Sequence, residues 1–386
     1  MEKGTCLLLA LLLVVHASET AFSAPRGGRG GALSSAAREG DVEKVKALLS
    51  AGEKVNVKDR SGRTALMVAI EEGHIEVAKV LIEASGPQLN ETDKGGRTAL
   101  ILAVRENHIE LVEALIRAGA ALNEMSRDGR TALILAVMEG YSEAAKILIA
   151  AGADLNETDK RGRTALIAAA QDNNIEVMNA LIAAGADLNE RDQRGWTALM
   201  TTVREGYVEA TKIFIDAGAD LNEKDQRNWT ALMFAAKEGS VEAVKALIDA
   251  GADLNEKDRE GVTALLLTVK VTRIEAIEAL IEAGADLNER DNDGWTALLM
   301  AIRMDRIQAV TALIEAGADL NERDKEGRTA LMLAAEYGQI ESVEALLEAG
   351  ADLKGKAKDG RTALKRAQGG GYTRIVELLK EAGAKK

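Results

Sequence analysis

A Thr-Ala-Leu triplet recurs along most of this 386-residue chain at a nearly constant spacing. The first step between copies is 34 residues, and every later step is 33 residues. The ten copies begin at Thr64, Thr98, Thr131, Thr164, Thr197, Thr230, Thr263, Thr296, Thr329 and Thr362. A fixed period of this length indicates a repeat array, in which each unit packs only against its neighbours. The chain length alone would suggest about two or three globular domains, but the repeat makes that interpretation unnecessary.

Each unit contains two short apolar stripes with helical spacing. In the first full copy, one stripe lies within residues 66–70 and the second within residues 75–82. These patterns predict two short helices, each with one apolar side. Gly73 lies between them and can supply the positive φ of a tight turn, while Thr64 can cap the first helix. The polar remainder of the unit, with a glycine at its tip, predicts a hairpin-like loop.

One such helix pair cannot bury its stripes alone, but stacked copies can share a continuous core. The pattern resembles the ankyrin repeat, which has this period and a Thr-Pro-Leu-His-x-Ala signature. In the first copy, Ala65 stands at the proline position and Met67 at the histidine position, and later copies have similar replacements. The resemblance extends from about Gly31 to the C-terminus. We therefore expect an all-α ankyrin-repeat solenoid of stacked helix-turn-helix units with hairpin-like loops.

The repeat boundaries divide the chain into three predicted segments. These are a signal peptide at residues 1–23, a Gly/Arg linker at 24–31 and an ankyrin repeat domain at 32–386. Within the domain we predict an N-terminal capping helix pair at 32–58, repeats at 59–356 and a C-terminal capping repeat at 357–386.

The N-terminal segment has the composition of a cleavable leader. Lys3 precedes an apolar run at residues 7–15, and small residues follow it, which is typical of a secretory signal peptide. The run is too short to form a stable membrane span. Residues 20–38 contain Arg, Ser and Gly but no acid, which is typical of a transit peptide. We predict entry into the export pathway, with secretion or a periplasmic location. The alternative is a plastid of an alga with a secondary plastid, because the segment also resembles a bipartite plastid leader.

The sequence contains no catalytic, cofactor or metal motif that we can identify. His74 and His108 occupy the same turn position in successive copies, and this pair supplies too few ligands for a metal site. Neither a Gly-Lys-Thr phosphate loop nor a Gly-x-Ser-x-Gly elbow is present. We therefore expect a non-catalytic protein that has no cofactor and no metal.

The chain is acidic, with a formal net charge of −13 at pH 7. Because the acids recur with the repeat, we interpret them as a solvated surface that keeps the array soluble and monomeric. A basic partner is the alternative interpretation of these acids. No long basic stripe offsets them, so we do not expect nucleic-acid binding.

Function in such an array is expected where otherwise similar copies differ. One variable column directly follows the tip residue of the loop, and it holds all three tryptophans of the chain. The column consists of Trp196, Trp229, Val262 and Trp295, flanked by Arg163 and Arg328. Because exposed aromatic patches mark binding sites, we predict an apolar strip about 30–40 Å long that contacts a partner. The alternative is that each Trp folds onto its neighbour's loop and stiffens the stack.

A second variable set lies at the end of the first helix of each unit. It includes Arg204, Lys237, Lys270, Met304 and Tyr337. The ankyrin resemblance implies that both sets line a concave groove that holds partners. We predict a non-catalytic scaffold that binds a protein or peptide through this hairpin and inner-helix face. The alternative is a structural or spacer solenoid without a dedicated groove.

Three sequons could carry N-linked sugars, at Asn90, Asn156 and Asn228. Asn228 replaces the glycine at a loop tip, where asparagine tolerates positive φ. A glycan at Asn228 would compete with binding through Trp229, so the two hypotheses exclude each other.

Overall fold

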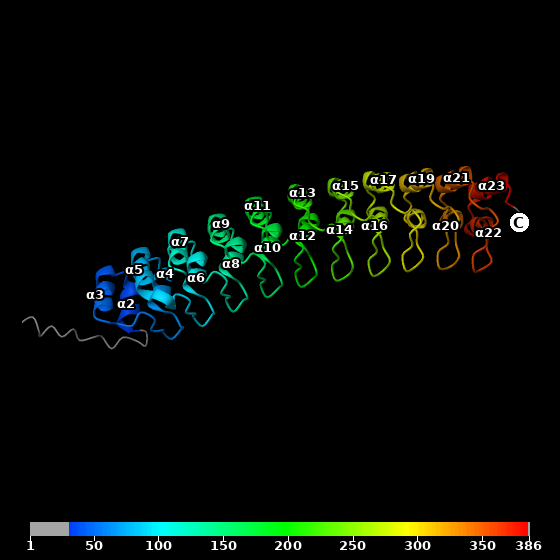
Figure 1. Ribbon diagram of the computed structural model, residues 1–386. Coiled ribbons are helices and arrows are strands. Elements are labelled where there is room, and N and C mark those ends of the chain that lie inside the picture. The colour runs from blue at the N-terminus through cyan, green and yellow to red at the C-terminus, as the bar shows by residue number, and fades with distance from the viewer. Residues whose placement is uncertain (1–30, 385–386) are drawn as a thin grey trace, which may run out of the picture. The chain divides into compact units, whose positions relative to one another are not determined.

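The computed structural model describes residues 31–384. The predicted leader at residues 1–23 and nearly all of the linker lie outside the described residues. The chain divides into two compact units, with the boundary between Ala153 and Asp154. Within residues 31–384 both units contain helices, turns and loops but no strand. The all-α prediction is therefore confirmed, and Figure 1 shows the regular helix pairs within each unit.

Unit 1 begins with a capping helix pair, α2 (Gly31–Glu39) and α3 (Val42–Ser50). The first helices of its three repeats are α4 (Ala65–Glu71), α6 (Ala99–Arg105) and α8 (Ala132–Met138). The second helices are α5 (Ile75–Ser85), α7 (Ile109–Arg117) and α9 (Ser142–Ala150). A short 3-10 helix, η1 (Gly86–Gln88), follows α5 and coincides with the single 34-residue step of the sequence.

Unit 2 contains seven repeats. Their first helices are α10 (Ala165–Gln171), α12 (Ala198–Glu205), α14 (Ala231–Glu238), α16 (Ala264–Val271), α18 (Ala297–Arg303), α20 (Ala330–Tyr337) and α22 (Ala363–Gly370). Their second helices are α11 (Ile175–Ala183), α13 (Val208–Asp216), α15 (Val241–Asp249), α17 (Ile274–Glu282), α19 (Ile307–Glu315), α21 (Ile340–Glu348) and α23 (Thr373–Glu381). Within the unit, first helices form one layer, second helices form another, and the loops extend beyond the first helices (Figure 1).

The threonine of the recurring triplet starts each first helix. Thr197 has extended backbone angles, and its Oγ1 accepts a hydrogen bond from the backbone N–H of Met200 at 3.2 Å. This bond satisfies one of the N–H groups that a helix start leaves without a partner. Thr329 is an exception, because its side chain makes no cap hydrogen bond. The predicted capping role is confirmed in the other repeats of both units.

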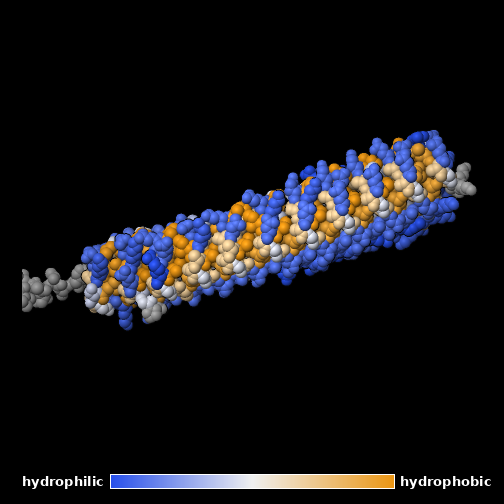
Figure 2. Space-filling model, turned by 45° about the horizontal axis from the view of Figure 1, so that its top comes forward, coloured by the Kyte–Doolittle hydropathy of each residue, from blue (hydrophilic) through white to orange (hydrophobic). Residues whose placement is uncertain are grey.

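The core lies around the first helices. Helix α12 buries every residue from Ala198 to Val203, whereas α13 buries only Ala210, Thr211 and Phe214. The reason is that α12 packs against α10 and α14 as well as against its own partner α13. Fully burying a leucine or phenylalanine side chain contributes roughly 1.5–3 kcal/mol, so each repeat depends on its neighbours for stability. Figure 2 shows the surface along each unit, where hydrophilic ridges alternate with more hydrophobic bands.

One aspartate closes each typical loop. In the loop before α12, Asp192 Oδ1 accepts hydrogen bonds from the backbone N–H groups of Arg194 and Trp196 at 2.8 and 3.0 Å. Gly195 at the tip has a φ of +82°, and a Cβ there would lie 2.9 Å from the backbone nitrogen of Gln226. Glycine therefore allows the next loop to approach. The predicted hairpin-like loops are turns closed by this aspartate, and they contain no strands.

Asparagine side chains connect successive loops in unit 2. Asn189 Oδ1 accepts the backbone N–H of Asp220 at 2.9 Å, and Asn222 Oδ1 accepts that of Asp253 at 2.8 Å. Ion pairs run parallel to these bonds, for example between Arg191 and Glu223 at 3.3 Å. The loops are thus ordered by their neighbours as well as by their own turns.

Four loop or turn positions depart from the glycine pattern in unit 2. Asn173, Asn228, Thr272 and Asp305 have φ values of 52°, 63°, 61° and 55° at positions where most repeats have glycine. This left-handed region is tolerated by asparagine and aspartate but is rare for a β-branched residue such as threonine.

Among residues 31–384, no helix combines the length and the apolar character that crossing a membrane would require.

Candidate partner-binding site

The predicted column of variable residues lies in unit 2, at the junction of the loops and the first helices. Trp196, Trp229, Val262 and Trp295 are only 8%, 9%, 3% and 7% exposed. The prediction that they form an exposed apolar strip is therefore wrong. The rings of Trp196 and Trp229 fold against the protein because their indole N–H groups reach acceptors in the next loop.

Two of the tryptophans reach into the following repeat. Trp196 Nε1 donates a hydrogen bond to Asp225 Oδ2 at 3.2 Å, and Trp229 Nε1 donates one to Asp258 Oδ2 at 3.0 Å. Phe234 contacts both rings edge-on, with centroid distances of 5.4 and 5.2 Å. Such edge contacts are favourable between aromatic rings. This geometry corresponds to the alternative prediction, in which each Trp folds onto its neighbour's loop.

The flanking arginines bond within their own loops. Arg163 Nε and Nη2 donate to Asp159 Oδ2 at 3.0 and 2.7 Å, and its Nη1 donates to Gln171 Oε1 at 3.1 Å. Arg328 Nε likewise donates to Asp324 Oδ2 at 2.7 Å. The column thus contains arginines such as Arg163 and Arg328, which bond inside their own loops, as well as tryptophans such as Trp196 and Trp229, which bond to the next loop.

The pKa of the Asp159 carboxyl lies below its ordinary value. Burial alone would raise this pKa, but hydrogen bonds from the Arg163 side chain and from the backbone N–H groups of Arg163 and Arg161 outweigh burial. These donors stabilise the ionised carboxylate. The same loop motif lowers the pKa of Asp59 in unit 1.

A row of cations covers the column. The guanidinium carbon of Arg204 lies 4.5 Å from the ring centroid of Trp196, and that of Arg303 lies 4.7 Å from the centroid of Trp295. Lys237 Nζ lies 5.3 Å from the centroid of Trp229. These distances are within the range of favourable cation–π contacts.

The four repeats from α12 to α18 each place one cation at the same helical position. We call this set the basic ladder, and it consists of Arg204, Lys237, Lys270 and Arg303. Lys270 has no tryptophan beneath it, because its repeat has Val262 in the column, and both line a hollow of about 630 Å³. Gln171 and Glu336 occupy the same position in α10 and α20, so the ladder is confined to these four repeats.

Two loop arginines add to the positive charge beside the ladder. The guanidinium carbon of Arg194 lies 3.8 Å from the Trp196 centroid, and that of Arg227 lies 4.5 Å from the Trp229 centroid. Both also pair with the buried aspartate of their own loop. The sequence analysis missed Arg194, Arg227 and Arg303. The available signals were an arginine two residues before two of the tryptophans and the 33-residue step from Lys270 to Arg303.

Acidic side chains also lie beside the ladder. Glu205 Oε1 lies 3.3 Å from Arg204 Nη1, and both residues are exposed. Asp293 pairs with Lys325 at 2.8 Å, and this hydrogen bond lowers the pKa of the Asp293 carboxyl. Glu260, Asp291 and Asp293 line the same hollow as Lys270 and Arg303. Part of the positive charge in the second half of the ladder is therefore balanced by these acids, whereas Lys237 has no such acid described beside it.

Apolar side chains accompany the second half of the ladder. Met304 lines the hollow together with Trp295 and Met300. Tyr337, at the end of α20, is 41% exposed, and Val271 at the end of α16 is 37% exposed. Of these two predicted partner-binding residues, Met304 lines the hollow, and Tyr337 is exposed at the equivalent position of the next repeat.

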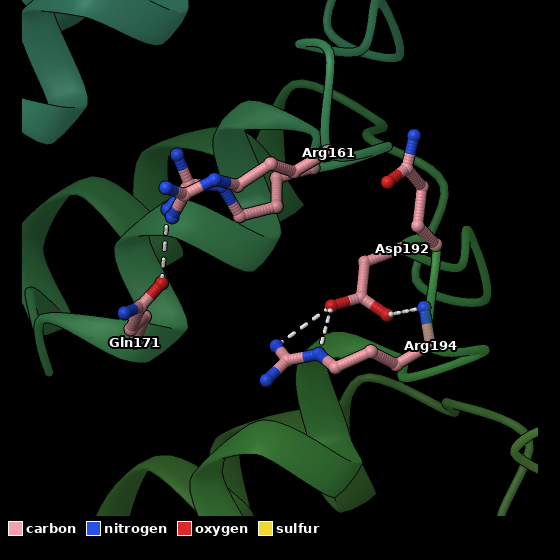
Figure 3. A pocket seen from close by; sticks show the side chains of 6 residues that line it. Arg161, Gln171, Asp192 and Arg194 are labelled. Atoms are coloured by element: carbon pink, nitrogen blue, oxygen red, sulfur yellow. Dashed lines mark hydrogen bonds and ion pairs between the residues drawn. The ribbon is translucent and has the colours of Figure 1, made fainter.

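A second hollow of about 360 Å³ lies at the beginning of the ladder (Figure 3). It is lined by Arg161, Arg163, Gln171, Asp192, Gln193 and Arg194. In Figure 3 two overlapping arginine side chains extend towards Gln171, which accepts a hydrogen bond from Arg163, whereas Arg194 turns towards Asp192. Cations from two adjacent loops therefore meet here.

The three sequons differ in their surroundings. Asn90 Oδ1 accepts the backbone N–H of Ala121 at 2.8 Å, and Asn156 Oδ1 accepts that of Asp187 at 2.9 Å. Asn228 lies exposed at its loop tip. Glycosylation of any of these residues stays a prediction.

No group of three or more potential metal ligands occurs among residues 31–384. The His74 ring nitrogen Nε2 lies 3.0 Å from the backbone carbonyl oxygen of Arg38. His74 therefore packs the turn of its own repeat against the turn of the preceding repeat.

The stacked helix pairs, the 33-residue period and the threonine caps define an array of the ankyrin type. A family model for ankyrin repeats (3 copies) matches residues 33–126, 110–192, 166–258, 251–324 and 313–386. The chain belongs to the ankyrin repeat family. Proteins of this family are generally non-catalytic modules for protein interaction, which agrees with the predicted class of function.

A shorter similarity links the chain to a curated plant protein. A segment of 47 residues is 47% identical to the acyl-CoA-binding domain-containing protein 2 of Arabidopsis thaliana. The matched segment covers 12% of this chain and 13% of the length of that protein. This similarity therefore concerns little more than one repeat.

Proposed function

We propose that this protein is a non-catalytic scaffold that binds a protein or peptide partner through the loops and first-helix ends of unit 2. The basic ladder is the observation that carries the proposal. Four successive repeats present a cation at one position, and three of these cations rest on buried tryptophan rings. We call this surface, with the column beneath it, the ladder face.

Stability alone does not account for this arrangement. The repeats with Arg163 and Arg328 close their loops with an internal arginine–aspartate pair. The tryptophan repeats have a buried ring at this position, and an exposed cation, such as Arg204 or Lys237, rests on that ring. Tryptophan and arginine are also the residues that contribute most to protein interfaces. An exposed cation held in place by a ring is therefore well suited to contact a partner.

Site-specific photo-crosslinking tests this proposal against the spacer alternative. A benzophenone amino acid would replace Lys270 on the ladder face or, as the matched control, the exposed Glu278 on the second helix of the same repeat. The full-length protein would be irradiated in extracts of its source cells, and adducts would be identified by mass spectrometry. We expect one partner to be captured from position 270 and not from position 278. Equal capture at both positions, or none at either, would favour a spacer without a dedicated binding face.

A further inference from the structure

We infer that the ladder face binds an extended acidic segment of a protein, with carboxylates about every third residue. This inference rests on the proposed function, because it specifies the partner of the same surface.

The spacing of the ladder sets the spacing of the partner's charges. The four cations are equivalent residues of successive first helices, and packed helices lie about 8–10 Å apart. An extended chain of the polyproline II type has three residues per turn and advances about 3.1 Å per residue, so about three residues match one repeat and every third side chain lies on the same side. A segment with acids at positions 1, 4, 7 and 10 can therefore place one carboxylate at each ladder residue. Gln171 and Glu336 limit the complementary segment to these four charges.

The tryptophans hold the cations in position before a partner arrives. Trp196 is fixed by its hydrogen bond to Asp225, and Trp229 is fixed by its bond to Asp258. A cation resting on a fixed ring loses less conformational freedom on binding than a free surface cation. The rings therefore serve as supports for Arg204 and Lys237, which would make the contacts to carboxylates.

Charge complementarity favours an acidic occupant. The whole chain carries a net charge of −13, yet the ladder places four cations in one row, beside Arg194 and Arg227, which pair with buried aspartates of their own loops. Arg204 is paired with Glu205 at 3.3 Å, but an exposed pair of this kind is weak. A partner carboxylate can therefore displace it. The acidic remainder of the surface would repel a partner that bound out of register.

Single-stranded nucleic acid fits this surface less well. Proteins that bind it stack successive bases on exposed aromatic rings. Here Trp196, Trp229 and Trp295 are 8%, 9% and 7% exposed, so they offer no such stacking surface.

The test uses the full-length protein and four fluorescent ligands of equal length. The first is a twelve-residue Gly/Ser/Thr peptide with Asp at positions 1, 4, 7 and 10. The second has the same composition with its four Asp residues consecutive. The third has Asn in place of Asp, and the fourth is an oligouridine. Fluorescence anisotropy at low and at moderate salt would give the four Kd values.

A matched pair of charge-reversal variants locates the binding site. One variant combines Lys237→Glu with Lys270→Glu on the ladder. The control combines Lys212→Glu with Lys245→Glu, which are exposed on the second helices α13 and α15. Both variants change the net charge of the protein equally. If the peptide were held only by general electrostatic attraction, its Kd would therefore change equally in both.

We expect the spaced acidic peptide to bind more tightly than the other three ligands. Its Kd should rise with salt, because the contacts are between charges near the surface. The ladder variant should weaken binding by about tenfold or more and the control by less than about twofold, as expected for losing two contacts rather than none.

Equal binding of the spaced and clustered peptides, equal effects of the two variants, or preference for oligouridine would overturn the inference. If no acidic peptide binds but position 270 still captures a partner, the acidic specificity is wrong and the proposed function stands. If position 270 captures nothing either, both are wrong.

Discussion

The indole Nε1 of Trp196 donates a hydrogen bond to Asp225 Oδ2 in the loop of the following repeat, at 3.2 Å. Asp225 also accepts the backbone N–H groups of Arg227 and Trp229 at 2.7 and 2.8 Å. One carboxylate thus closes its own loop and fastens the preceding repeat to it. Where the column holds an arginine, such as Arg163, the corresponding carboxylate bonds the arginine of its own loop instead.

Removing this indole donor should weaken the stacking of unit 2. Trp196→Phe keeps an aromatic ring but loses the bond to the buried Asp225. Because hydrogen bonds to charged groups contribute roughly 1.5–3 kcal/mol, we expect the free energy of unfolding to fall by about that amount. Urea unfolding monitored by circular dichroism would measure the change.

Trp295→Phe provides the matched control for ring size. In that repeat the equivalent acceptor, Asp324 Oδ2, receives Arg328 Nε at 2.7 Å, and no indole hydrogen bond is found among the described residues. Trp295→Phe should therefore cost roughly 1.5–3 kcal/mol less than Trp196→Phe. Equal losses in the two variants would show that the ring, and not its N–H group, stabilises the stack.

The lowered pKa of Asp159 predicts a pH-dependent contribution to stability. An unfolded aspartate has a pKa of about 3.9, and hydrogen bonds in the folded protein lower that of Asp159. Its contribution is therefore complete above about pH 4–5 and is lost as the pH falls through the lowered folded pKa. We expect Asp159→Asn to reduce the free energy of unfolding by about 1–3 kcal/mol at pH 7. The difference in the free energy of unfolding between the variant and the wild type should be smaller at pH 3.

Urea unfolding at pH 7 and pH 3 would test this prediction. Asp249→Asn, at the exposed end of α15, serves as the control and should show little such effect. If Asp159→Asn lowers the free energy of unfolding by the same amount at both pH values, an electrostatic role for this carboxylate is contradicted.

The left-handed Thr272 should be a site of strain. Thr272 ends α16 with φ 61° and ψ 49°, where the equivalent residue after α12 is Gly206 with φ 77°. The left-handed region costs a residue with a side chain roughly 1–2 kcal/mol, and the greater flexibility of unfolded glycine offsets about half of that. Thr272→Gly should therefore raise the free energy of unfolding by about 0.5–1 kcal/mol.

The reverse change at Gly206 is the control for backbone strain. A Cβ added to Gly206 would meet no atom within 4 Å, so Gly206→Thr tests the backbone angle without a clash. We expect it to lower the urea midpoint. If Thr272→Gly lowers the midpoint as well, the threonine side chain contributes packing that outweighs its strain.

The predicted leader can be tested without the rest of the chain. Fusing residues 1–40 to a fluorescent protein should direct the reporter into the export pathway, because residues 7–15 have the apolar character of a signal peptide. Microscopy and the size of the processed fusion would measure the outcome. Plastid fluorescence would support the bipartite alternative, and an uncleaved reporter that stays in the cytosol would contradict both.

Most of the fold follows from the period of the sequence. The threonine before each first helix predicts its starting position, and Thr197 indeed caps α12. The apolar spacing predicts which residues are buried, because helical periodicity determines the side of the helix on which they lie. Repeats also limit the possible contacts to near neighbours, so local patterns are sufficient to define the architecture.

The orientation of the tryptophans could not be predicted in the same way. The sequence places Trp196 and Trp229 in one column, but their rings could turn towards solvent or towards the next loop. Their direction depends on whether a carboxylate of the following repeat is available as an acceptor, as Asp225 is for Trp196 although it also accepts Arg227 Nε. That availability depends in turn on whether the following column residue is an arginine, as Arg328 is, which is a relation between repeats and not within one.

The asparagine bonds between loops have a consequence for how such a protein can change over evolutionary time. Asn222 receives the backbone N–H of Asp253, and Asn255 receives that of Asp286 in the same way. Every junction of this kind presents the same donor and the same acceptor. A recombination event that duplicated or deleted one whole repeat would leave the newly joined copies correctly matched, so the length of the protein can change in one step without an unpaired junction.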